Sequence, residues 1–215
     1  MRLTRYGHAA LLVETRNTRI LVDPGNFSSD AAFGLTDLDL IAVTHQHPDH
    51  ADLERLPALL EANRGARLLA EPQIAERLRP AGGDWEDTAP ERSVDVGDVR
   101  LTGVGGVHAA IHPDLERVGN VGLLLAADDE PTLFHPGDSY EFAPAGVEVL
   151  AVPLAAPWAK LSETIDFVRA VGPRIVVPIH DCTIAEVAYP MYWGRVEDMG
   201  GAEGRLLAQD GSTTV

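Results

Sequence analysis

The chain has 215 residues, of which 45% are hydrophobic and 23% are charged, a composition typical of one large globular domain or two small ones. Its formal net charge of -16 gives an acidic surface that repels phosphate backbones, so we expect a small-molecule substrate and no nucleic-acid partner. No apolar run approaches the ~20 residues of a membrane span, no signal-peptide core is visible and Cys182 is the only cysteine, so we expect a cytoplasmic protein without a disulfide.

Short strand-like runs dominate the chain, with turn residues such as Asn17-Thr18 between them. We predict strands over residues 2–6, 9–15, 18–22, 38–44, 66–70, 93–96, 98–104, 119–127, 131–134, 147–152 and 174–179. A weaker pair of strands is predicted near the C-terminus, over residues 205–208 and 212–215.

Helix signals are fewer, and they predict helices over residues 57–63, 72–79 and 162–171. The first two begin at a proline, which fits the first turn of a helix, and the third has Ser162 as a suitable N-cap. Two long segments rich in Gly, Pro, Asp and Glu are predicted to be loops, over residues 81–92 and 181–204. Two packed sheets covered by helices would bury the apolar segments, so we predict a single domain over residues 1–215.

The most informative feature is the hexapeptide His45-Gln46-His47-Pro48-Asp49-His50, which directly follows a predicted strand. Ligands delivered by the end of a strand can converge on one point from a rigid edge. Four other predicted strands also end in or near a potential ligand, namely Asp23, His108, Asp138 and His180. Imidazole nitrogens and carboxylate oxygens suit zinc, manganese or iron, so the pattern predicts a metal centre.

This ordered set resembles the motifs of the metallo-β-lactamase superfamily, which are an early Asp, His-x-His-x-Asp-His, a His, an Asp and a final His. The resemblance extends across nearly the whole chain. Gly7-His8-Ala9-Ala10 and Phe134-His135-Pro136-Gly137-Asp138-Ser139 are similar to the branch that contains ascorbate-6-phosphate lactonase-like proteins. The resemblance implies an α/β fold built as a four-layer αββα sandwich, with metals at one edge between the sheets.

The resemblance also implies a dinuclear centre with two divalent metal ions. The first metal would be held by His45, His47 and His108, the second by Asp49, His50 and His180, and Asp138 would bridge both. Zinc is the default metal, and manganese and iron are compatible with the same donors. Asp23 would accept a hydrogen bond from a ligand imidazole and fix its tautomer.

Such a centre implies a hydrolase. A bridging carboxylate sets two cations about 3.5–4 Å apart, and the pair lowers the pKa of a shared water so that a hydroxide forms near neutral pH. Asp49 and Asp138 are the expected catalytic carboxylates, with Asp49 orienting the nucleophile and passing a proton to the leaving group. We therefore expect hydrolysis of an ester-like bond in a small molecule: a lactone, a thioester or a phosphoester.

Differences between this sequence and other branches of the superfamily narrow the range of expected reactions. Antibiotic-hydrolysing members usually place a cysteine among the ligands of the second metal, whereas His50 ends the hexapeptide here and Cys182 follows His180. Flavodiiron members carry a flavin domain and RNA-processing members need an RNA-gripping arm, and neither is visible. Glyoxalase II-like members usually add a helical C-terminal segment, which the predicted loop over residues 181–204 lacks.

Three alternatives remain open at this point. The same metals could serve a phosphodiesterase that acts on a nucleotide or a lipid headgroup. Iron in the same ligands would favour a redox enzyme. A non-catalytic metal-binding protein usually lacks some of the ligands, and here none is missing.

Four residues outside the ligand set are candidates for substrate contact: His8, Tyr140, Trp158 and Lys160. Lys160 is the only lysine and stands near a predicted helix N-terminus, which could bind an anionic group. We expect His135 to be structural, His112 to be exposed and Cys182 to be a small buried hydrophobe. The aromatic residues that follow His180 favour either a pocket wall or a homodimer contact: Tyr189, Tyr192 and Trp193.

Overall fold

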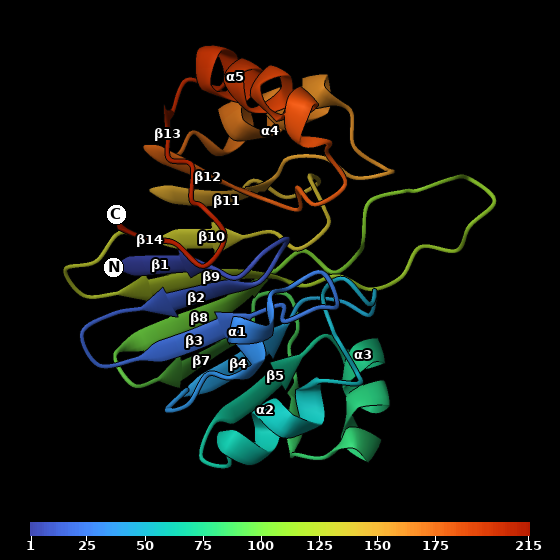
Figure 1. Ribbon diagram of the computed structural model, residues 1–215, viewed down its shortest axis with the longest axis vertical. Helices are drawn as coiled ribbons and strands as arrows, with labels where there is room; N and C mark the ends of the chain where they lie inside the picture. Colours follow the sequence, from blue (N-terminus) through green and yellow to red (C-terminus); the bar gives the residue numbers. More distant parts are fainter.

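The computed structural model describes residues 1–215, and it has four layers in the order helix, sheet, sheet, helix (Figure 1). Three helices cover the outer face of the first sheet: α1 (Asp30–Phe33), α2 (Leu56–Ala62) and α3 (Pro72–Leu78). Two helices cover the outer face of the second sheet: α4 (Leu161–Val171) and α5 (Tyr189–Gly200). Two short 3-10 helices complete the set: η1 (Arg79–Ala81) and η2 (Glu186–Ala188). The predicted αββα sandwich is confirmed.

The first sheet contains β1 (Arg2–Arg5), β2 (Leu11–Glu14), β3 (Arg19–Val22), β4 (Leu40–Val43), β5 (Arg67–Ala70), β6 (Trp85–Asp87) and β14 (Ser212–Thr214). Its strand order is β14-β1-β2-β3-β4-β5-β6. The strands from β3 to β6 are parallel to one another, whereas β14, β1, β2 and β3 pair antiparallel.

The second sheet contains β7 (Ser93–Val96), β8 (Val99–Val104), β9 (Gly122–Ala127), β10 (Leu133–His135), β11 (Val149–Pro153), β12 (Ile175–Ile179) and β13 (Glu203–Gly204). Its order is β13-β12-β11-β10-β9-β8-β7. The strands from β10 to β13 are parallel, and β8 points the same way because it and β10 both pair antiparallel with β9.

The apolar runs are continuous because both faces of each sheet are buried. In β3, Ile20 and Val22 enter the core between the sheets, whereas Leu21 packs under the helices of the first layer. The core between the sheets contains 21 buried residues drawn from both sheets, so the two sheets share one interior. Residues that follow β4, β10 and β12 come together at one edge of the sandwich.

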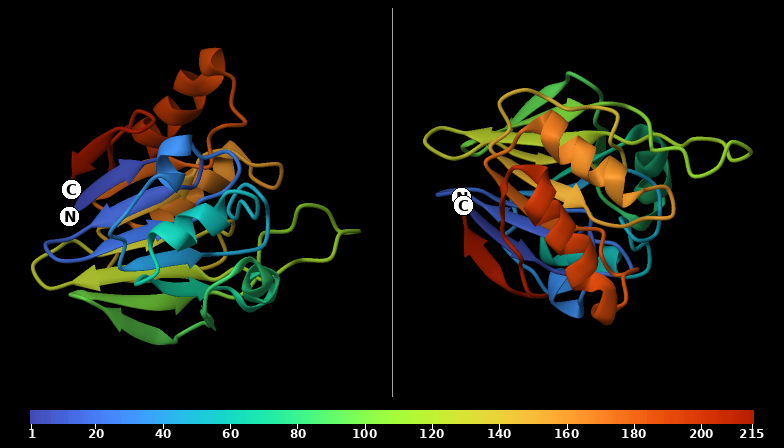
Figure 2. Two further views of the ribbon diagram at one scale, coloured as in Figure 1. Left: turned by 60° about the horizontal axis from the view of Figure 1, so that its bottom comes forward. Right: turned by 90° about the horizontal axis from the view of Figure 1, so that it is seen from above.

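The termini lie side by side at the opposite edge (Figure 2), since β14 pairs with β1. The predicted C-terminal hairpin is wrong, because the strand near the C-terminus takes this distant partner rather than residues 205–208. None of the helices has the length and apolar content that a bilayer-spanning helix requires.

Three local predictions also need correction. The predicted loop over 181–204 contains α5, whose buried face carries Trp193, Val196 and Gly200. The loop over 81–92 contains β6, which extends the first sheet. The N-cap of α4 is Lys160 rather than Ser162, and the carboxylate of Glu163 accepts the Lys160 N–H at 3.3 Å.

Candidate metal centre

The predicted ligands meet at the edge where the parallel strands end. Two adjacent groups form there, each with its potential ligand atoms within 4.8 Å of one another. The first group is His45, His47, His108 and Asp138. The second group is His8, Asp49, His50 and His180. The side chains come from five separate segments of both sheets, and all but His47 and Asp49 are buried.

Asp138 lies between the two groups. Its Oδ1 is 3.1 Å from His50 Nε2, and its Oδ2 is 3.0 Å from His180 Nε2 and 3.4 Å from His108 Nε2. Donors about 2.1 Å from one tetrahedral ion are roughly 3.4 Å apart, so these separations suit atoms that share a cation. One carboxylate is therefore within reach of donors from both groups.

Hydrogen bonds fix the tautomers of the rings. Asp23 Oδ2 accepts from His50 Nδ1 at 2.7 Å and from Thr44 Oγ1 at 2.7 Å. Because the Thr44 hydroxyl donates its hydrogen bond to Asp23, the hydroxyl oxygen accepts the hydrogen bond from His45 Nδ1, at 3.1 Å. Asp23 therefore holds two imidazoles, one directly and one through Thr44, and each ring directs its Nε2 into the site.

Backbone carbonyls fix the tautomers of two other rings, His108 and His180. His108 Nδ1 donates to Ala109 O at 2.7 Å, and His180 Nδ1 donates to Ala155 O at 2.7 Å. Both rings therefore direct Nε2 into the site, where it can bind a cation once it carries no proton. The exception is His47, whose Nδ1 lies 3.1 Å from His45 Nε2 and so is the atom that faces the first group.

Three atoms of the cluster are buried without any hydrogen-bond partner: His50 Nε2, His108 Nε2 and Asp138 Oδ1. A buried polar atom left unpaired costs about 1–3 kcal/mol, so such atoms need an explanation. Bare imidazole nitrogens and a carboxylate oxygen are the donors that zinc, manganese and iron accept. The donor set therefore fits divalent cations.

The electrostatics are strongly coupled. Burial lowers the pKa of His45 well below its usual value. Burial alone would also lower the pKa of His50, but Asp138 and Asp23 outweigh it and raise that pKa well above the usual value. For His180, burial is again opposed by Asp138, and the pKa is raised to about 9. The carboxylates thus make two of the rings basic.

His8 is fully buried, and its Nε2 lies 3.1 Å from Asp49 Oδ2. Its Nδ1 accepts the backbone N–H of Cys182 at 3.4 Å, so the ring proton is on Nε2 and points at the carboxylate. The structure therefore places His8 as a donor to Asp49, beneath the ring of His180 at a centroid distance of 4.0 Å. It lies behind the site rather than on a surface that a substrate could touch.

Several residues with strained backbone conformations lie at the edge of the sandwich that carries the candidate ligands. His8, Asp23 and His180 all have positive φ, at 48°, 50° and 53°. Such left-handed conformations are uncommon for residues other than glycine and persist where the surroundings over-determine them. Here they turn the chain sharply after β3 and β12, so that the side chains point into the site.

The other substrate candidates lie on one side of the cluster. Trp158 Nε1 donates to Asp138 Oδ2 at 3.0 Å. The hydroxyl of Tyr140 donates to Pro153 O and lies 2.9 Å from Thr164 Oγ1, so only its ring can face a ligand. Lys160 is 79% exposed, and its Nζ lies 3.4 Å from Glu163 Oε1 rather than beside the candidate ligands.

Three further predictions can be compared with the structure. His135 is buried and bonded to Ala9 O and Gly137 N, so it is structural. His112 is exposed, as expected. Cys182 is exposed rather than buried, because it follows the turn at His180 and faces outward. The role of Thr44 is absent from the sequence predictions, although its position directly before His45 is the signal that points to it.

Comparisons with known proteins agree with this fold. Residues 2–180 match the Beta-lactamase superfamily domain. The Mycobacterium tuberculosis protein Rv0786c is 41% identical over 215 residues, which is all of both chains. A UPF0173 metal-dependent hydrolase of Opitutus terrae is 26% identical and covers 84% of each chain. Igni18, a metallo hydrolase from Ignicoccus hospitalis, has the same fold, with a TM-score of 0.77 and 20% identity over 100% of this chain and 97% of its own. The chain therefore belongs to the metallo-β-lactamase superfamily, among its metal-dependent hydrolases.

Proposed function

We propose that this metal-dependent hydrolase is dinuclear and cleaves an ester-like bond of a small molecule. His45, His47 and His108 would hold one divalent ion, Asp49, His50 and His180 the other, and Asp138 would bridge them. His8 is left out of the second set because its Nε2 carries a proton directed at Asp49. Zinc is the default metal, and iron or manganese suits the same donors.

The observation that carries the proposal is the position of Asp138. A single buried carboxylate lies within 3.4 Å of imidazoles from both groups, and one of its oxygens has no hydrogen-bond partner. Leaving such an atom unpaired is costly, and divalent cations held by the two groups would remove that cost. Two adjacent cations supply Lewis acidity and lower the pKa of bound water.

Asp49 is suited to move a proton during hydrolysis. It is more accessible than Asp138, with 23% of its side chain exposed against 3%. Burial alone would raise its pKa, but His180 and His8 hold the pKa well below the usual range, so the carboxylate is ionised at working pH. His8 fixes one oxygen of Asp49, which leaves the other free to accept a proton from water and pass it to the leaving group.

The bond class is ester-like: a lactone, a thioester or a phosphoester. The helix α5 follows the last predicted ligand, so the argument from a missing C-terminal helix against a glyoxalase II-like reaction no longer holds. Thioesters therefore stay in the proposal on the same footing as lactones.

The test starts from protein stripped with a chelator and reloaded with zinc, manganese or iron. We expect two equivalents of metal per chain and recovery of hydrolysis on a panel of lactones, thioesters and chromogenic phosphoesters. Asp49→Asn should retain at least the first metal and lose turnover by about 100-fold or more. One equivalent of metal in the fully active protein, or full activity in Asp49→Asn, would refute the proposal. Preference for phosphodiesters would instead identify the phosphodiesterase alternative.

A further inference from the structure

We infer that the cavity beside Trp158 receives the non-reacting part of the substrate, and that this part is an uncharged apolar group. The inference rests on the hydrolase function proposed above. It identifies a specificity pocket and the chemical class of what fills it.

The cavity has a volume of about 540 Å³, which is within the usual range for small-molecule sites. Its walls adjoin the candidate ligands along the chain. Ala109, Ala110 and Ile111 directly follow His108, and Trp158 donates to Asp138. A group held in this cavity would therefore present its reactive bond close to the metal centre.

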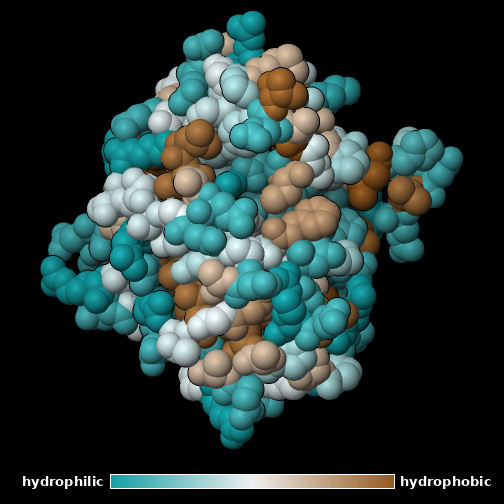
Figure 3. All heavy atoms as spheres, in the orientation of Figure 1, coloured by the Kyte–Doolittle hydropathy of each residue, from teal (hydrophilic) through white to brown (hydrophobic).

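Six of the ten residues that line the cavity are hydrophobic, and the charged ones are Glu141, Lys160 and Glu163. Trp158 and Tyr140 form an edge-to-face pair with ring centroids 4.8 Å apart, and Pro157 and Ile111 lie beside them. The hydroxyl of Tyr140 is committed to Pro153 and Thr164, so the pocket meets the carbon face of its ring. Ile111 belongs to the loop of residues 105–118, which projects from the body of the protein (Figure 1) and carries apolar atoms among hydrophilic ones (Figure 3).

The charges around the pocket are already paired. Lys160 Nζ lies 3.4 Å from Glu163, and Glu141 is bonded to Arg117. At the N-terminus of α4, the Glu163 carboxylate accepts the N–H of Lys160 and adds a negative charge to the lining of the pocket. A phosphate or carboxylate that entered the pocket would lose hydration and meet the like charges of Glu141 and Glu163. An apolar group meets no such penalty.

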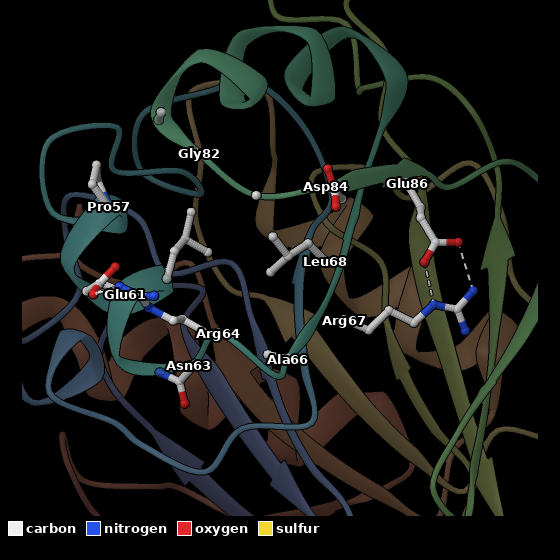
Figure 4. A pocket seen from close by; sticks show the side chains of 13 residues that line it. Pro57, Glu61, Asn63, Arg64, Ala66, Arg67, Leu68, Gly82, Asp84 and Glu86 are labelled. Atoms are coloured by element: carbon white, nitrogen blue, oxygen red, sulfur yellow. Dashed lines mark hydrogen bonds and ion pairs between the residues drawn. The ribbon is translucent and has the colours of Figure 1, made fainter.

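A second cavity, of about 460 Å³, does not compete for this role. It lies between α2, the start of β5 and residues 81–86, which lead into β6 (Figure 4), whereas the candidate ligands follow the opposite ends of the strands. Its two arginines are paired as well, Arg64 with Glu61 and Arg67 with Glu86. No predicted metal ligand lines it.

The test compares p-nitrophenyl acetate, butyrate and hexanoate with the acid-terminated p-nitrophenyl hemiglutarate, using metal-loaded protein. We expect kcat/KM to rise roughly fourfold per added methylene, because burying a methylene contributes about 0.8 kcal/mol, which is about that factor. The acid-terminated ester should be at least tenfold slower than the hexanoate. Ala110→Trp should lower kcat/KM for the hexanoate about tenfold and for the acetate less than twofold. The matched control is Ala62→Trp on the exposed surface of α2, which should leave the series unchanged.

A flat chain-length series, a preference for the acid-terminated ester, or an equal effect of Ala110→Trp on all esters would overturn the inference. Binding of hexanamide, followed by ligand-observed NMR, separates it from the proposed function. If metal-loaded protein cleaves no ester but Ala110→Trp still abolishes hexanamide binding, the ester reaction is wrong and the apolar pocket stands. If hexanamide binds equally to wild type and Ala110→Trp, the pocket assignment is wrong.

Discussion

Asp23 Oδ2 accepts a hydrogen bond from His50 Nδ1 at 2.7 Å, and both side chains are completely buried. The same carboxylate receives the hydroxyl and the backbone N–H of Thr44, and through that hydroxyl it also orients His45. One carboxylate behind the site therefore sets the direction of two rings that belong to different candidate metal positions.

Replacement of Asp23 by alanine should weaken metal binding at both positions. Loss of a carboxylate that orients a ligand histidine typically costs 10–100-fold in metal affinity. We expect a decrease of about that size for each metal, measured by competition with a chromophoric chelator. Asp114→Ala, on the exposed loop, removes the same charge without touching the cluster and should have no effect. A decrease at only one metal would contradict the shared role of Asp23.

Metal binding should release protons and strengthen as the pH rises. The pKa of His180 is raised to about 9 in the metal-free protein, because the attraction of Asp138 exceeds the opposing effect of burial. The ring is therefore charged at neutral pH and must lose its proton before it can hold a cation. We expect apparent affinity to increase about tenfold per pH unit for each proton displaced.

Calorimetry in two buffers of different ionisation enthalpy measures this proton release directly. The stability of the metal-free protein gives a second check. A raised pKa of His180 contributes stability that is fully present below the unfolded value of 6.5 and is lost as the pH rises through about 9. The free energy of unfolding of the metal-free protein should therefore fall as the pH rises from 6.5 to about 9. A pH-independent affinity between about 6 and 8 would show that the rings are already neutral.

The sequence is sufficient to predict which side chains meet at the metal centre. His108 and His180 are far apart in the chain, but each follows an apolar run that ends at the same edge of the sandwich. Parallel strands in a layered fold leave few other places for such residues. The hexapeptide and the residues that end the other strands therefore indicate the site without any knowledge of the tertiary structure.

The details that orient the ligands are less accessible from the sequence. The carbonyls of Ala109 and Ala155 fix two tautomers, and a backbone carbonyl has no residue-specific signature. The helix α5 escapes prediction because Gly194 and Pro190 obscure its apolar spacing. The pairing of β14 with β1 depends on a contact between chain ends, which local patterns do not encode.

Gly25 should be indispensable for the hexapeptide turn. A Cβ atom at this position would lie 1.8 Å from Asp49 O and 2.4 Å from His50 N, so the backbone of the turn would have to move. We expect Gly25→Ala to lower the free energy of unfolding by about 1–3 kcal/mol and to reduce metal affinity as well. Urea unfolding and metal competition measure the two effects. Gly65→Ala is the matched control, since a methyl group at Gly65 would have no neighbouring atom within 4 Å, and it should be nearly neutral or slightly stabilising.

The ion pair between Arg5 and Asp181 should stabilise the segment that follows His180. Their side chains are only 12% and 5% exposed, and Tyr189 donates a further hydrogen bond to Asp181 at 2.9 Å. Arg5→Met leaves a buried carboxylate without its cation, so we expect a loss of about 3–5 kcal/mol in the free energy of unfolding.

The double variant Arg5→Met/Asp181→Leu removes both charges and should recover much of that loss. Replacing a buried ion pair by apolar groups of similar volume often changes the free energy of unfolding little. The exposed pair Arg100 and Asp95 offers the comparison, with side chains 65% and 66% exposed. Arg100→Met should change the free energy of unfolding little, because an exposed ion pair is screened by water. Chemical denaturation of wild type and the three variants measures these differences. Equal losses for Arg5→Met and Arg100→Met would mean that water, rather than Arg5, solvates Asp181, and the segment after His180 would then owe its position to packing alone.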